Sequence, residues 1–129
     1  MWLLACHLAA IPILTSPSFG FISYMNPRGI LLFMVVAWGT TALAAFTLWP
    51  AIARRRLAVA YPIALAAAFL PVALAWGVAL HTLYWRPGDG FFEFIRWVKA
   101  AVVLGGVYTT GYWLPTSVLS CFILRRRAN

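Results

Sequence analysis

The sequence predicts an all-α membrane protein, a single domain over residues 1–129 built as a bundle of four transmembrane helices with short loops. Only 9% of its residues are charged and 64% are hydrophobic, whereas a soluble domain carries about 25% charged residues. The apolar residues form four long stretches, at about 2–24, 30–52, 57–84 and 98–124. Two arginine triplets adjoin these stretches. A protein with this much apolar surface would not remain dissolved in water. We therefore expect a bilayer around the chain.

The first stretch, at about 2–24, is interrupted by Pro12 and Pro17. No Lys or Arg precedes Arg28, and a signal peptide needs a basic start, so we expect this segment to be retained. Proline kinks or ends a helix, and the unbroken apolar run is shorter than the ~20 residues of a full crossing. We therefore predict a kinked span, with a shorter re-entrant segment as the alternative.

The second stretch, 30–52, follows a predicted turn at 25–29 and holds no charged residue. It is long enough to cross the hydrocarbon core. Ala37, Thr41 and Ala45 recur every four residues, which predicts a face of small side chains where another helix approaches closely.

The third stretch, 57–84, contains Pro62 and Pro71 and is longer than a perpendicular crossing requires. Tilt or a kink near Pro71 would absorb the surplus length. Its many alanines predict a thin helix at the centre of the bundle. A Pro-Gly-Asp-Gly turn at 87–90 then ends the span.

The last stretch, at about 98–124, is preceded by an amphipathic segment in which Glu93 and Arg96 are spaced to pair on one helical face. Pro115 permits a kink within the span. Three glycines offer points of close helix approach: Gly105, Gly106 and Gly111.

The arginine triplets predict the orientation of the chain. They are topology anchors, and they consist of Arg54, Arg55, Arg56, Arg125, Arg126 and Arg127. Two crossings separate them, so both can lie on one side, and positive charge in short loops stays cytoplasmic. A complete first span then places both termini in the cytoplasm, and the 85–97 loop outside.

His7 and His81 are the only histidines. Ligation of haem between helices is one interpretation, but a fully crossing first span puts the two near opposite faces. The favoured interpretation is two interfacial histidines, with no cofactor, no metal and no catalytic residue. Cys6 beside His7 does not form a nucleophile–base pair, because neighbouring helical residues point about 100° apart. We expect Cys6 and Cys121 to act as small hydrophobes and not as a disulfide.

The most polar part of any span is a stripe on the last one. It consists of Tyr108, Tyr112, Thr116 and Ser120. One interpretation is the lining of a site for a quinone headgroup, a lipid or a small polar solute. The favoured one is hydrogen bonding between packed helices, at about 0.6 kcal/mol each.

The charge distribution disfavours two classes of function. The net charge of +8 resides largely in the triplets, which leaves no soluble basic face for nucleic acid. No acid lies within a span, which disfavours ion-coupled transport. We therefore expect a non-enzymatic accessory or scaffolding subunit of a bacterial inner membrane. Its partners would be other membrane proteins or itself, and lipids including anionic headgroups. The alternatives are a small transporter or pore-forming homo-oligomer, and a quinone- or haem-linked redox subunit.

Overall fold

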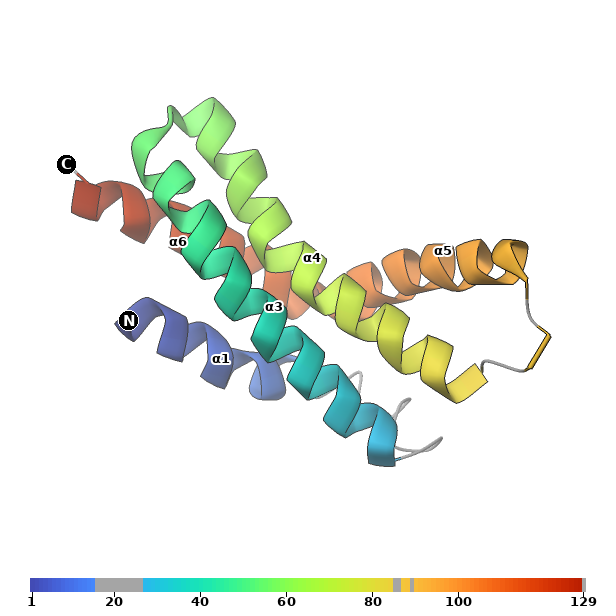
Figure 1. Cartoon of the computed structure of the whole chain (residues 1–129). Helices are drawn as coiled ribbons and strands as arrows, with labels where there is room; N and C mark the ends of the chain where they lie inside the picture. The colour runs from blue at the N-terminus through green and yellow to red at the C-terminus, as the bar shows by residue number, and fades with distance from the viewer. Residues whose placement is uncertain (16–26, 85–86, 89, 129) are drawn as a thin grey trace.

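The computed structural model describes residues 1–15, 27–84, 87–88 and 90–128. Within these ranges every element is an α-helix (Figure 1). The helices are α1 (Trp2–Leu14), α3 (Pro27–Arg54), α4 (Leu57–Tyr84), α5 (Phe91–Tyr108) and α6 (Thr110–Ala128). The all-helical class is confirmed, and the bundle of four complete spans stays a prediction.

α3 and α4 form an antiparallel hairpin, and both are long and apolar enough to cross a membrane. This is compatible with a membrane protein. α4 has the bounds that the sequence predicts. α3 begins at Pro27, three residues earlier than expected, within the segment predicted as a turn. Proline favours the first helical position, because its fixed φ suits a helix and its missing N–H is not needed there.

α4 is the central helix and packs against α3, α5 and α6, as its small side chains predict. Trp76 of α4 is fully buried and lies in the main core with Phe33 and Tyr112. A Cβ atom on Gly105 of α5 would stand 3.2 Å from the Trp76 side chain, and one on Gly106 would stand 3.1 Å from Phe69. These two glycines therefore allow the close approach of α5 to α4.

The predicted last span differs in that the structure divides it at Thr109, into α5 and α6. The hydroxyls of Thr109 and Thr110 donate to the carbonyls of Gly105 and Gly106, four residues earlier. Such bonds compete with the backbone ladder and bend helices, and the glycine pair offers little resistance. The chain therefore bends here, whereas α6 continues through Pro115.

The start of α1, the end of α6 and the α3–α4 turn lie at one end of the molecule, and the start of α5 lies at the other (Figure 1). α1 has 13 residues and is about 20 Å long at ~1.5 Å per residue. The remainder of the predicted first span, 16–24, lies outside the described residues. Beyond α4, Gly88 has φ of 103°, which suits glycine in the predicted turn.

Candidate functional site

The described polar contacts between helices gather where α1, α3 and α6 meet. His7 Nδ1 lies 2.9 Å from the carbonyl oxygen of Leu3, and His7 Nε2 lies 2.7 Å from Ser120 Oγ. A carbonyl only accepts, so Nδ1 carries a proton and donates it, and in the neutral ring Nε2 accepts from Ser120. The carbonyl of Thr116, 2.5 Å from Ser120 Oγ, competes for the same hydroxyl proton.

Two tryptophans of α3 also contact α1. The indole of Trp49 meets the His7 ring edge-on, with ring centroids 5.2 Å apart. Nearer the middle of α3, Trp38 Nε1 donates to the carbonyl oxygen of Leu8 at 3.0 Å. Two tryptophans and one histidine thus hold α1 against the rest of the chain.

Three members of the predicted polar stripe share one buried face of α6: Tyr112, Thr116 and Ser120. Tyr108 is separated from them by the bend at Thr109. It ends α5, is half-exposed, and stacks on Trp76 with ring centroids 6.2 Å apart. The stripe is therefore not one continuous surface.

The buried hydroxyl of Tyr112 interacts with that of Thr41, on the small face of α3. Neither hydroxyl oxygen has a partner within full hydrogen-bond geometry. The face of Ala37, Thr41 and Ala45 is buried, as predicted. The Thr116 hydroxyl donates to the Tyr112 carbonyl oxygen of its own helix.

The structure does not bring the two histidines together. His7 contacts Trp49, which packs in one cluster with Ile63 of α4. His81 is in the last turn of α4 and contacts Phe94. At ~1.5 Å per residue, His81 lies about 27 Å further along α4 than Ile63. Among the described residues, no cluster of three or more His, Cys, Asp or Glu could hold a metal ion, and both cysteines are free.

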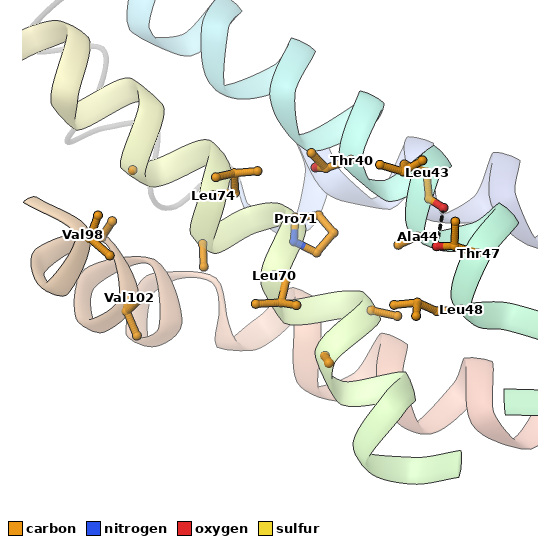
Figure 2. Close-up of a pocket in the computed structure, with 15 residues that line it drawn as sticks. Thr40, Leu43, Ala44, Thr47, Leu48, Leu70, Pro71, Leu74, Val98 and Val102 are labelled. Carbon is orange, nitrogen blue, oxygen red and sulfur yellow. Dashed lines mark hydrogen bonds between the residues drawn. The ribbon is translucent and has the colours of Figure 1, made fainter. Parts of the chain in front are cut away.

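A wide apolar groove of about 490 Å³ lies on the α3, α4 and α5 surface. Figure 2 shows the side chains of all three helices around it. The hydroxyls of Thr40 and Thr47 donate to carbonyl oxygens of α3 itself, at 2.6 and 2.8 Å, so the groove is almost wholly apolar. Small side chains form much of its wall: Ala44, Ala66, Ala67, Ala73, Gly77 and Ala101.

This groove was not predicted from the sequence. Its α3 wall consists of Thr40, Leu43, Ala44, Thr47 and Leu48. These positions have helical i, i+3, i+4, i+7 spacing, which is a readable signal. Nothing in the spacing tells which other helices complete the groove.

The predicted pairing of Glu93 with Arg96 is confirmed. Arg96 Nη1 and Glu93 Oε1 are 3.8 Å apart at the exposed start of α5. An exposed pair of this kind contributes little to stability. It does neutralise the only acid in α5 within its own helix.

No known protein family, curated protein or solved structure matches the chain.

Proposed function

We propose that the protein is a non-enzymatic accessory subunit of a bacterial inner membrane, and that a transmembrane helix of another membrane protein packs into the α3–α4–α5 groove. One observation carries this proposal: the groove is wide, apolar and walled by small residues. Small side chains let two helix backbones approach closely in lipid, where dispersion contacts drive association.

The chemistry of the groove favours a helix over a polar solute. A small-molecule site has a few polar groups that orient the ligand. The Thr40 and Thr47 hydroxyls are already bonded within α3. A transmembrane helix satisfies its own backbone hydrogen bonds and presents only side-chain surface, which is what the groove accommodates.

The buried polar groups support the same interpretation. The Thr116 hydroxyl donates to a carbonyl oxygen of its own helix, and Ser120 bonds to His7 of α1. A transport path along this stripe would need those hydroxyls to face an open route. Their contacts favour a packing role, and the pore-forming homo-oligomer remains the second proposal to be tested against the first.

The proposal includes an orientation of the chain in the membrane. The two arginine triplets and both chain ends share one end of the molecule (Figure 1). The positive-inside rule places that end in the cytoplasm. Reporter fusions after residue 129 and in the 85–90 loop test this, and a cytoplasmic signal from the loop fusion would contradict it.

The experiment is purification of the full chain from its native membrane in mild detergent, with identification of what accompanies it. Ala66→Leu fills the groove from the partly exposed α4 wall and should release the partner. Ala58→Leu is the matched control, because Ala58 is exposed on α4 and does not line the groove. Ala44→Leu repeats the test from α3 if Ala66→Leu does not fold.

The outcomes separate the classes of function. Loss of the partner with Ala66→Leu but not with Ala58→Leu supports the accessory subunit. A symmetric homo-oligomer with no other protein would overturn it in favour of the pore. A Soret band that His81→Ala removes would instead indicate the haem-linked subunit.

A further inference from the structure

We propose that a second groove, between the start of α4 and the end of α6, binds one anionic phospholipid. The groove has a volume of about 450 Å³ and lies at the end of the molecule that carries both arginine triplets. It is lined by Leu57, Tyr61, Val118, Cys121, Phe122, Arg125 and Arg126. It is distinct from the α3–α4–α5 groove, with which it shares no residue.

The positive charge of this groove favours the binding of an anion. Arg125 and Arg126 line it directly, and an arginine guanidinium binds phosphate with paired N–H donors. The α4 helix begins beside them at Leu57, so the positive end of its dipole adds to the field.

The acid whose position the structure describes does not supply that anion. Asp89 and Glu93 are the only acids in the sequence. Glu93 is in the first turn of α5 and pairs with Arg96, near the loop that joins α4 to α5 at the far end of α4. Among the residues that the structure describes, no carboxylate side chain therefore lies beside these arginines, and phosphate from the surrounding membrane fits their charge.

The rest of the lining fits the body of a lipid and not a free phosphate. Leu57, Val118 and Phe122 are exposed apolar side chains, with Phe122 at 67% exposure. Phe122 and Val118 precede Arg125 by about one and two turns of α6, so they lie further from the arginines and suit one acyl chain. Tyr61 is one turn into α4 from Leu57 and is partly exposed, a position where a tyrosine typically lies at the headgroup boundary.

The test is lipid binding to the purified full chain in a neutral detergent, read by native mass spectrometry. Phosphatidylglycerol is compared with phosphatidylcholine of the same acyl chains, and glycerol phosphate is added as a competitor without acyl chains. We expect one phosphatidylglycerol to be retained, and excess glycerol phosphate not to displace it.

Arg125→Gln together with Arg126→Gln should weaken phosphatidylglycerol binding roughly 30-fold, since each arginine near a headgroup contributes about a factor of five. The matched control is Arg54→Gln with Arg55→Gln. It removes the same charge at the same end of the molecule but does not line the groove, and we expect less than about a threefold change because of screening.

Val118→Trp provides a second test without a change of charge. It fills the apolar part of the groove and should weaken binding about tenfold, which supports a seated acyl chain. Equal losses in both arginine pairs, displacement by glycerol phosphate, or unchanged binding in Val118→Trp would each overturn the proposal.

Discussion

Gly105→Ala is expected to destabilise the packing of α5 on α4, whereas Gly39→Ala is not. The added Cβ at Gly105 would stand 3.2 Å from three atoms of Trp76, which is fully buried. At Gly39 the same atom meets nothing within 4 Å. The two variants gain the same helix propensity, about 1 kcal/mol, so the difference between them isolates the packing cost.

That cost is about 1–3 kcal/mol for an overpacked site. Gly106→Ala provides an intermediate case, because its Cβ would meet the far end of the Phe69 ring at 3.1 Å. Phe69 is only partly buried and can rotate away, so the loss should be smaller. The expected order of stability is Gly39→Ala, then Gly106→Ala, then Gly105→Ala.

The assay is reversible unfolding of the purified protein in mixed micelles, with helicity measured against the fraction of denaturing detergent. Pairing Gly105→Ala with Trp76→Leu should recover part of the loss, because the smaller side chain removes the contact. Equal free energies of unfolding for Gly105→Ala and Gly39→Ala, within about 0.5 kcal/mol, would contradict the close packing of α5 on α4.

Three further predictions concern α1 and the thiols. A double-mutant cycle of His7→Ala and Ser120→Ala should give a coupling of about 0.6 kcal/mol in unfolding, typical of hydrogen bonds between membrane helices; zero coupling would contradict the contact. Trp38→Phe removes an indole donor to α1 and should cost about 1 kcal/mol, seen as faster hydrogen exchange in α1 but not in α4. Cys6 is exposed and Cys121 is buried, so maleimide in detergent should modify Cys6 first; the reverse order would contradict the packing of α6.

Much of the helical layout could be read from the sequence, because the signals are local. The bounds of α4 follow from a continuous apolar run between Arg56 and the turn at 87–90. The pairing of Glu93 with Arg96 follows from helical spacing alone. The bend at Thr109 was not predicted: Pro115 is the stronger local signal, but the hydroxyls of Thr109 and Thr110 act on two glycine carbonyls.

The candidate sites depended more on tertiary structure. Spacing placed Tyr112, Thr116 and Ser120 on one face of α6, but it did not show that Ser120 bonds to His7 or that Tyr112 faces Thr41. Spacing also grouped Tyr108 with these three residues, whereas the bend at Thr109 places Tyr108 on α5. Contacts between helices distant in the sequence depend on how the helices rotate and cross, and periodicity within one helix does not determine either.

The sequence alone determined the helical class and the charge asymmetry of this protein and predicted a membrane as its surroundings, because composition and hydrogen-bond satisfaction in lipid leave few other structures. Only the tertiary structure decided that α3, α4 and α5 enclose an apolar groove and that Arg125 and Arg126 line a second one beside Leu57. A groove is a property of several helices together. Its shape depends on which faces meet, and small residues such as Gly105 set how closely they do.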